Sequence, residues 1–238
     1  MHGYTSDAST IQKYAGMNKI ADKHGFAVCY PRGTVDHRGN RFWNVGYDFH
    51  PGVSIDDVDF IVKLVRYLQK EHALNPQNTF ATGMSNGGEM SYLLACRASS
   101  TFRAVAPVAG MMLQKFFDDC VSTIPVFEIH GTADDINRFT GDINGDDGWG
   151  AYPDIPSTIT YWKSQNGCTS IKIDTLADLI KSDGSYIISQ KFLDCEDDNQ
   201  VWLYKVINGK HDWPGSSGNM DIVSSEEVWG FFENFAAD

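Results

Sequence analysis

The sequence predicts an α/β fold in which helices cover both faces of a mostly parallel, doubly wound β-sheet. Residues 102–110 and 124–135 are largely apolar, as expected for strands that are buried on both faces. Segments with apolar residues at helical spacing alternate with these strands, and this alternation is typical of parallel sheets. The chain has 238 residues, 42% of them hydrophobic, which suits one domain with a single core. We therefore expect one catalytic domain over residues 1–238.

The first third of the chain predicts a helix, a strand, a long loop and a second helix. Residues 11–24 have helical character, and the apolar residues 26–30 are expected to form a buried parallel strand. Residues 32–52 are rich in glycine, asparagine and aromatic residues without a clean period, which is typical of a functional loop. Ser54 is the expected N-cap of a helix that ends near His72.

The remaining elements continue the alternation of strand and helix. Residues 142–154 are the exception, because they form a polar loop with acidic residues at alternate positions. A calcium-binding EF-hand loop needs glycine at its sixth position and glutamate at its twelfth, and this sequence has Asp147 and Pro153 there. We therefore expect no metal site. The other expected elements are a strand at 78–82, a helix after residue 87, strands at 102–110 and 124–135, a helix at 158–165, strands at 184–193 and 201–207, and a helix at 224–235.

Residues 83–87, Gly-Met-Ser-Asn-Gly, lie between an expected strand and an expected helix. A G-x-S-x-G at such a junction is the nucleophile elbow of α/β-hydrolases, a sharp turn that exposes the serine hydroxyl. Gly83 and Gly87 are expected where strand and helix crowd together, because a Cβ there would force them apart. Ser85 is therefore the candidate nucleophile. The alternative is a tight turn with an incidental serine, since five-residue patterns recur by chance.

Two later loops carry the other residue types of a serine hydrolase. Asp134 and Asp135 end the strand at 124–135, and His211 follows the last expected strand. This order of nucleophile, acid and base is that of α/β-hydrolases, and open α/β sheets place their sites at these strand ends. His211 would take the proton of Ser85, and Asp134 or Asp135 would orient the imidazole. A turn-capping role for Asp135 and a surface role for His211 are the alternatives.

An acyl-transfer site also needs two backbone N–H donors for the oxyanion and a surface for the substrate. The N–H of Asn86, directly after the nucleophile, is one expected donor, and that of Tyr4 is the other. Trp43, Trp213 and Thr5 are expected to contact the substrate, because aromatic rings stack well on phenolic acids and sugars. Ordinary packing of these loops is the alternative.

Five cysteines are present, and none has the spacing of a metal site. Cys29 lies within an apolar run and is expected to be a buried free thiol. For the others we expect the bridges Cys96–Cys120 and Cys168–Cys195, which would imply an oxidising compartment. Four reduced thiols in a cytosolic protein are the alternative that the sequence leaves open.

The net charge of −12 limits the class of partner. Nucleic acid and anionic membrane would both be repelled, so we expect neither as a partner. No stretch approaches the roughly 18 to 20 apolar residues of a membrane span. The start of the chain has no signal-peptide pattern, an observation of little weight if the chain is a trimmed form. The oligomeric state is left open.

Seven short segments are spread over nearly the whole chain: HGYT (2–5), YPRGT (30–34), FWNVG (42–46), GMSNGG (83–88), APVAG (106–110), HGTAD (130–134) and HDWPG (211–215). Together they resemble the polyhydroxybutyrate depolymerase and feruloyl esterase family of α/β-hydrolases. The resemblance implies an esterase without a cofactor, secreted or periplasmic, with Ser85 as nucleophile, Asp134 rather than Asp135 as acid and His211 as base. Family members often pair cysteines near residues 166–168, which supports the second bridge.

The leading hypothesis from this resemblance is a serine ester hydrolase acting on feruloyl or acetyl groups of xylan in plant cell walls. The runner-up is a depolymerase of short polyhydroxyalkanoates, and a hypothesis of another class is a carbohydrate-binding relative without activity. In relatives an apolar strand leads into the His-Gly motif, whereas this sequence begins at Met1. Such a gap would leave exposed ladder edges. We therefore expect low activity, or completion of the sheet by a partner, if this is the whole protein.

Overall fold

The computed structural model describes residues 1–237. Its main sheet has six strands in the order β3-β4-β5-β8-β7-β6. The strands β3, β4, β5 and β8 pair in parallel, whereas β7 pairs antiparallel with β8 and with β6. A separate antiparallel pair is formed by β1 and β2. The strands are β1 (Thr34–Val35), β2 (Arg41–Phe42), β3 (Phe80–Met84), β4 (Ala104–Val108), β5 (Val126–Gly131), β6 (Ser170–Thr175), β7 (Tyr186–Leu193) and β8 (Val201–Ile207).

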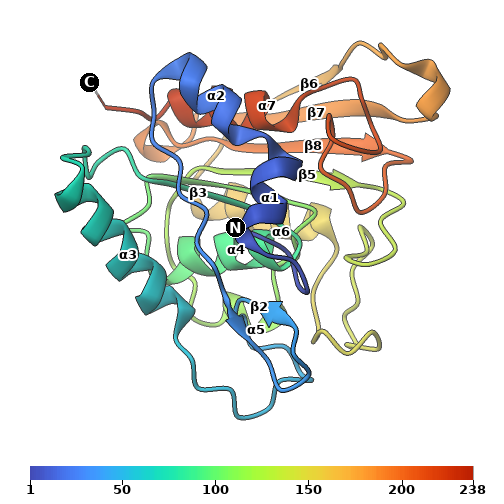
Figure 1. The fold of residues 1–238 in the computed structure, drawn as a ribbon. Helices are drawn as coiled ribbons and strands as arrows, with labels where there is room; N and C mark the ends of the chain where they lie inside the picture. Colours follow the sequence, from blue (N-terminus) through green and yellow to red (C-terminus); the bar gives the residue numbers. More distant parts are fainter. Residues whose placement is uncertain (238) are drawn as a thin grey trace.

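Helices cover both faces of the sheet (Figure 1). One face carries α3 (Asp57–Glu71), α4 (Asn86–Arg97) and α6 (Ile155–Gln165), and the other carries α1 (Ala8–Ala15), α2 (Met17–His24) and α7 (Ser224–Glu233). Short turns complete the fold: α5 (Gln114–Phe117) and the 3₁₀ turns η1 (Lys181–Asp183) and η2 (Glu196–Asp198). None of the helices over residues 1–237 combines the length and apolar character that crossing a bilayer requires.

The core consists of two apolar layers, one on each face of the sheet. Successive side chains of a strand point to opposite faces, so Val126 packs with the α4 and α6 layer while Phe127 and Ile129 pack with the α7 layer. The completely buried rings of Trp162 and Phe231 lie in these two layers. Burial on both faces explains why the central strands have apolar sequences.

Several expected elements differ from the structure. The expected helix at 11–24 is two helices, because Gly16 adopts a left-handed conformation with φ of 65° between α1 and α2. The N-cap of α3 is Asp56 rather than Ser54, and its side chain accepts a hydrogen bond from the N–H of Asp59 at 2.9 Å. The strand β6 has a mostly exposed and polar sequence, so its apolar pattern was too weak to predict it.

The expected strand at 26–30 is wrong: these residues are irregular, with no sheet partner among residues 1–237. Backbone groups of a strand need a neighbouring strand on at least one side, and here the nearest sheet edge is separated from the segment by a cavity. For the same reason the burial expected for Cys29 is wrong, since its side chain is an exposed free thiol. An apolar run alone does not provide the neighbour that would bury it.

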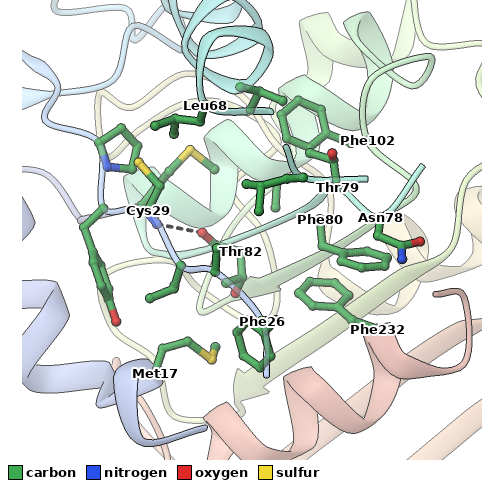
Figure 2. A pocket seen from close by; sticks show the side chains of 18 of the residues that line it. Met17, Phe26, Cys29, Leu68, Asn78, Thr79, Phe80, Thr82, Phe102 and Phe232 are labelled. Carbon is green, nitrogen blue, oxygen red and sulfur yellow. Dashed lines mark hydrogen bonds between the residues drawn. The ribbon is translucent and has the colours of Figure 1, made fainter. Parts of the chain in front are cut away.

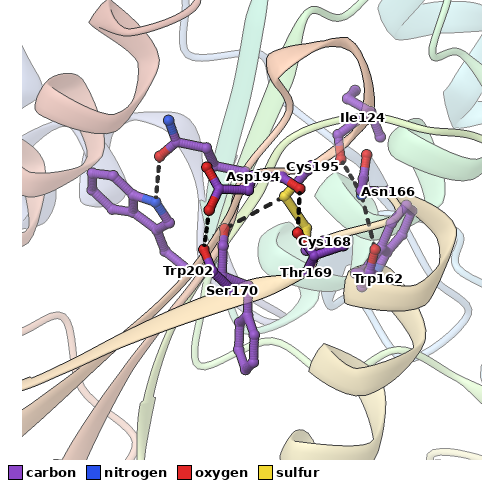
Figure 3. Close-up of a disulfide and its surroundings, with 11 residues drawn as sticks. Ile124, Trp162, Asn166, Cys168, Thr169, Ser170, Asp194, Cys195 and Trp202 are labelled. Carbon is purple, nitrogen blue, oxygen red and sulfur yellow. Dashed lines mark hydrogen bonds between the residues drawn. A yellow bond between two sulfur atoms is a disulfide. The ribbon is translucent and has the colours of Figure 1, made fainter.

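Both expected disulfides are present. Cys96–Cys120 links α4 to the segment after α5, and Cys168–Cys195 links the end of α6 to the end of β7. Figure 3 shows the second bridge beside Asn166, whose side-chain amide donates to the carbonyl of Ile124 at 3.1 Å. The two bridges therefore fasten helices of one face to neighbouring loops and to the antiparallel part of the sheet.

Removing the first bridge with the double change Cys96→Ala and Cys120→Ala is expected to lower the free energy of unfolding by roughly 2–4 kcal/mol. The bridge closes a loop over a sequence separation of 24 residues, and its loss restores the entropy of that loop in the unfolded chain. Urea unfolding followed by circular dichroism measures the difference. Cys29→Ala is the matched control, since it removes an exposed thiol and leaves both bridges. Equal unfolding free energies for the double variant and the control would contradict this role.

Candidate active site

Ser85 occupies a sharp turn between β3 and α4. Its backbone has φ of 56° and ψ of −123°, a left-handed conformation that is rare outside glycine. Such strain costs on the order of 1–3 kcal/mol and persists only where the surroundings hold it. The N–H of Ser85 donates to the carbonyl of Val108 at 3.0 Å, and its carbonyl accepts from the N–H of Glu89 at 2.9 Å. The half-buried serine is thus fixed at the carboxyl end of β3.

Gly83 and Gly87 lie where strand and helix crowd together, as the sequence predicted. A Cβ on Gly83 would lie 2.5 Å from the carbonyl oxygen of Gly87, and a Cβ on Gly87 would lie 2.4 Å from that of Met1. Real Cβ atoms do not approach backbone oxygen this closely. The strand, the helix and the N-terminal segment therefore meet directly behind Ser85.

Asp134 and His211 are in contact at the ends of the neighbouring strands β5 and β8. The Nδ1 atom of His211 lies 2.8 Å from Oδ2 of Asp134. Asp134 is buried, and its other oxygen accepts the N–H groups of Ile136 and Asn137 at 2.9 Å each. Asp135, the alternative acid, is exposed. The structure thus pairs the histidine with Asp134.

Hydrogen bonds link His211 to the start of α4 through Asp134 and Asn137. Burial raises the pKa of Glu89 to about 7, while hydrogen bonds from Tyr47, Asn86 and Asn137 oppose this shift. Glu89 is four residues beyond Ser85, in the first turn of α4. The side-chain amide of Asn137, in the acid loop, donates to Glu89 at 3.1 Å. The loops that carry the candidate acid and base are therefore connected to the start of α4.

Two backbone N–H groups lie beside Ser85 as candidate oxyanion donors. Asn86 is the first residue of α4, where N–H groups have no partner within the helix. Tyr4 belongs to a turn held by the N–H of Thr5, which donates to the carbonyl of Arg41 at 2.9 Å. The Tyr4 N–H is not a donor in any backbone hydrogen bond among residues 1–237. A Cβ on Gly3 would lie 3.3 Å from Cβ of Ser85, so this turn adjoins the nucleophile.

Trp43 and Trp213 do not contact a substrate-accessible surface, so the expectation that they bind substrate is wrong. Both rings are buried, at 0% and 2% exposure. The indole N–H of Trp43 donates to the carbonyl of His2 at 3.0 Å, and that of Trp213 donates to Ser225 at 3.2 Å. The backbone of Trp43 also holds the side-chain amide of Asn86, at 2.6 and 3.1 Å. These tryptophans fix the two sides of the site rather than line it.

The side chain of Tyr4 is held by a polar cluster that the sequence did not reveal. Its hydroxyl donates to Asp36 at 2.7 Å and accepts from the side-chain amide of Asn40 at 2.9 Å. Asp36 is in turn 3.0 Å from Nε2 of His50. The only sequence signal was that the loop at 32–52 lacked a period, because the contacts among its polar residues depend on the tertiary fold.

Half-buried aromatic rings gather around Tyr4. The rings of Phe49 and Trp149 meet it edge to face, with centroids 5.7 and 5.8 Å away. Thr5, the third residue expected to bind substrate, is exposed beside Tyr4. These rings provide a flat apolar surface beside the candidate oxyanion donor.

A second histidine contacts Asp134, the candidate acid, from inside the protein. Nε2 of His130 lies 3.4 Å from Asp134, and its Nδ1 lies 2.8 Å from Glu128. All three side chains are buried. Burial raises the pKa of Glu128 to about 7. Burial alone would lower the pKa of His130, but the hydrogen bond to Glu128 and the charges of Glu128 and Asp134 outweigh it, so the pKa of His130 is raised. The signal in the sequence was the pair Glu128 and His130 within an otherwise apolar strand.

The acidic loop at 142–154 is held by its own backbone. The carboxylate of Asp142 accepts the N–H groups of Asp146 and Asp147, at 3.0 and 2.8 Å. A bridge between Asp142 and Tyr152 closes the loop. No group of three or more histidine, cysteine or acidic side chains in the described part of the chain is placed to hold a metal ion.

Replacing Glu89 by Gln is expected to flatten the pH dependence of stability between pH 5 and 7. Burial raises the pKa of Glu89 from an ordinary value of 4.5 to about 7, so the folded state retains its proton to higher pH than the unfolded state. The stability that this group contributes is therefore full below pH ~4.5 and is lost as the pH rises through ~7.

Urea unfolding at several pH values measures this slope, which one proton changes by at most about 1.4 kcal/mol per pH unit. Glu71→Gln, at an exposed position on α3, is the control and should keep the slope of the parent. An unchanged slope in Glu89→Gln would contradict a protonated Glu89.

A family model described as "Esterase PHB depolymerase" matches residues 1–191. Among curated proteins, the chain is similar to a putative esterase, NocK, of Nocardia uniformis subsp. tsuyamanensis, with 30% identity over 59% of this chain and 40% of that protein. It is also similar to feruloyl esterase B of Piromyces equi, with 24% identity over 71% of this chain and 32% of the relative. The chain thus spans less than half the length of these curated relatives.

Solved structures show the same architecture. An acetyl xylan esterase from Aspergillus awamori aligns with a TM-score of 0.65 at 15% identity, covering 99% of this chain and 87% of that one. A carboxylesterase of Bacillus cereus aligns with a TM-score of 0.59 at 14% identity, over 99% of this chain and 86% of the other. At sequence identities of 14–15%, these alignments show that the chains share a fold. The α/β-hydrolase fold expected from the sequence is therefore confirmed.

Proposed function

The chain belongs to the esterase PHB depolymerase family, and on that premise we propose that it is a serine carboxylic ester hydrolase. The observation that carries the proposal is the 2.8 Å contact between His211 and Asp134 at the strand ends next to the strained turn of Ser85. A strained serine, a histidine and a buried carboxylate at one edge of a sheet are the parts of an acyl-transfer site. We propose that one catalytic domain, residues 1–238, carries this activity.

In the first half of the reaction, Oγ of Ser85 attacks the ester carbonyl while His211 accepts the hydroxyl proton on Nε2. Asp134 orients the imidazole through Nδ1 and stabilises its positive charge. The negative charge on the former carbonyl oxygen is stabilised by the N–H groups of Asn86 and Tyr4. When the tetrahedral intermediate collapses, the bond to the alcohol breaks and His211 returns the proton to that leaving oxygen.

In the second half, water hydrolyses the acyl group on Ser85. His211 takes a proton from the water as its oxygen attacks the acyl carbon, and a second oxyanion forms in the same N–H site. Collapse releases the carboxylic acid and returns the proton to Oγ of Ser85. The cycle consumes one water molecule for each ester and needs no cofactor.

We propose feruloyl or acetyl esters of plant cell-wall xylan as substrates. The half-buried rings of Tyr4, Phe49 and Trp149 support this choice, because flat apolar rings beside the oxyanion donor suit a phenolic acid or a sugar. Thr5, exposed at the same turn, is a further candidate contact. Relatives of the chain include a feruloyl esterase and a bifunctional acetylxylan esterase/xylanase.

A second candidate substrate is a short polyhydroxyalkanoate. A poly(3-hydroxyalkanoate) depolymerase C of Paucimonas lemoignei is among the relatives, with 26% identity over 46% of this chain. The third hypothesis, a carbohydrate-binding protein without activity, is disfavoured because the acid and base are in hydrogen-bonding contact. We also propose that the protein works in a secreted or periplasmic location, since two disulfides persist only in an oxidising compartment.

A panel of esters tests the substrate class. Methyl ferulate, acetylated xylan and 3-hydroxybutyrate oligomers are compared by kcat/KM with purified protein. We expect one of the two plant-wall substrates to give the highest value. A higher value for the hydroxybutyrate oligomers would favour the depolymerase, and no turnover of any ester would favour the binding protein.

A further inference from the structure

The two edges of the main sheet differ in their surroundings. At one edge, β3 lies against a cavity of about 850 Å³, and Figure 2 shows Met17, Leu68 and Phe232 among the side chains that line it. At the other edge, β6 is the outermost strand, beyond β7 (Figure 1), and no further strand lies beside it among residues 1–237. The edge of β6 is therefore the open side of the sheet.

The backbone groups on the outer side of β6 follow from its pairing with β7. The register of the two strands is continuous over Ser170–Thr175, and the N–H of Leu176 donates to the carbonyl of Ile187 at 2.9 Å. In an antiparallel pair, every second residue exchanges both of its backbone hydrogen bonds with the same neighbour. Leu176 and every second residue before it therefore bond to β7. The residues whose N–H and C=O point outward are Ile171, Ile173 and Thr175.

The devices that usually protect an open edge are weak in β6. Natural edge strands are often very short, interrupted by proline or a bulge, or marked by charged side chains. The six residues of β6 include no proline and pair with β7 without a bulge. The charge of Lys172 is balanced within the strand, because its nitrogen lies 3.1 Å from the carboxylate of Asp174. On the opposite face of the strand, Ile171 and Ile173 are 48% and 56% exposed.

The sequence of β6 is complementary to itself about Ile173. An antiparallel copy centred there places Ile173 opposite its own counterpart, Ile171 opposite Thr175, and Lys172 opposite Asp174. The pairs of outward-pointing residues exchange backbone hydrogen bonds, and the lysine and aspartate form the pairs between them, where side chains come closest. A copy centred on Lys172 or on Asp174 would instead place like charges opposite each other. Charge therefore selects the register centred on Ile173.

We propose that the edge of β6 pairs antiparallel with the same edge of a second copy of this chain, about a twofold axis at Ile173. The pairing joins the two six-stranded sheets into one continuous sheet and brings the exposed isoleucines of the two copies together. Because both copies use the same patch, the assembly closes as a dimer. The strands whose ends carry Ser85, Asp134 and His211 take no part in the contact, so both candidate active sites stay accessible.

The dimer is expected to be weak. A contact confined to one strand of six residues buries less than the roughly 1,600 Å² of a standard protein interface. The net charge of −12 on each copy also opposes their approach. We therefore expect a Kd on the order of 10⁻⁴ M. Measurements belong at about 0.15 M salt, where repulsion beyond ~8 Å is largely screened.

Sedimentation equilibrium of the full chain, from about 10 μM to about 1 mM, measures the association. Lys172→Asp and Asp174→Lys each place like charges opposite one another, so we expect each variant alone to dimerise roughly tenfold or more weakly than the parent. An equimolar mixture of the two variants restores opposite charges and should associate about as tightly as the parent. Lys19→Asp, with the same charge change at an exposed position on α2, is the control and should keep the parent Kd.

A mixture that associates no more tightly than the separate variants would overturn the proposal, as would a parent chain that stays monomeric at about 1 mM. Ile173→Pro tests the backbone pairing, because proline removes the outward N–H of the central pair and none of the bonds to β7. We expect unchanged circular dichroism and a loss of dimer, and an undiminished dimer would place the contact on another surface. Association is measured without substrate, so these outcomes do not depend on the proposed esterase function.

Discussion

Replacing Ser85 by Ala is expected to lower kcat/KM for p-nitrophenyl acetate by roughly 10⁴- to 10⁶-fold. The change removes the side-chain hydroxyl of the residue in the left-handed turn between β3 and α4. Without it, His211 and the oxyanion donors retain only the residual acceleration that such groups give alone. The substitution removes one atom from a half-buried side chain, so the fold should be unchanged.

Initial rates of nitrophenolate release measure the effect, and circular dichroism checks the fold. Ser54→Ala, at an exposed position before α3, is the matched control and should keep the parent rate. Ser85→Ala with more than about a tenth of the parent kcat/KM would show that another group is the nucleophile.

Asp134→Asn is expected to lower kcat by about 10⁴-fold, the loss that an amide in place of the triad acid has caused elsewhere. The amide cannot stabilise the imidazolium of His211, and it favours the tautomer with the proton on the wrong nitrogen. Asp135→Asn is a control with the same chemical change at the adjacent residue. Asp135 is exposed, whereas Asp134 lies 2.8 Å from His211.

The comparison of these two variants by steady-state kinetics decides between the acids. We expect Asp135→Asn to stay within about twofold of the parent, since exposed polar changes away from a site are close to neutral. A larger loss of kcat in Asp135→Asn than in Asp134→Asn would show that Asp135, not Asp134, is the acid that orients His211.

The fold class and the order of the three candidate catalytic residues could be predicted because they depend on local pattern. The glycines around Ser85 are needed for the close approach of strand and helix, and that need is visible in five residues. The ends of β5 and β8 were predictable because their strands are buried on both faces and have continuous apolar sequences.

The supporting contacts could not be predicted, because they join residues far apart in the sequence. The bonds from Trp43 to His2 and to Asn86 span more than 40 positions. A tryptophan in a loop has the same sequence signal whether it faces solvent or fills the space behind the nucleophile. Likewise, the contact of His130 with Asp134 depends on the turn after β5.

The expectation of a strand at 26–30 failed for a physical reason. The segment has the composition of a buried strand, but strand formation needs a partner, and β3 lies across a cavity. An apolar run therefore indicates the composition of a strand but does not show whether another strand lies beside it.

Covalent labelling shows whether Ser85 is the residue that becomes acylated. The protein is treated with a fluorophosphonate, which phosphonylates activated serines, and is then digested and analysed by mass spectrometry. We expect one label per chain, on Ser85, and none after the change His211→Ala. A label on any other residue, or no label on protein that hydrolyses p-nitrophenyl acetate, would contradict the account.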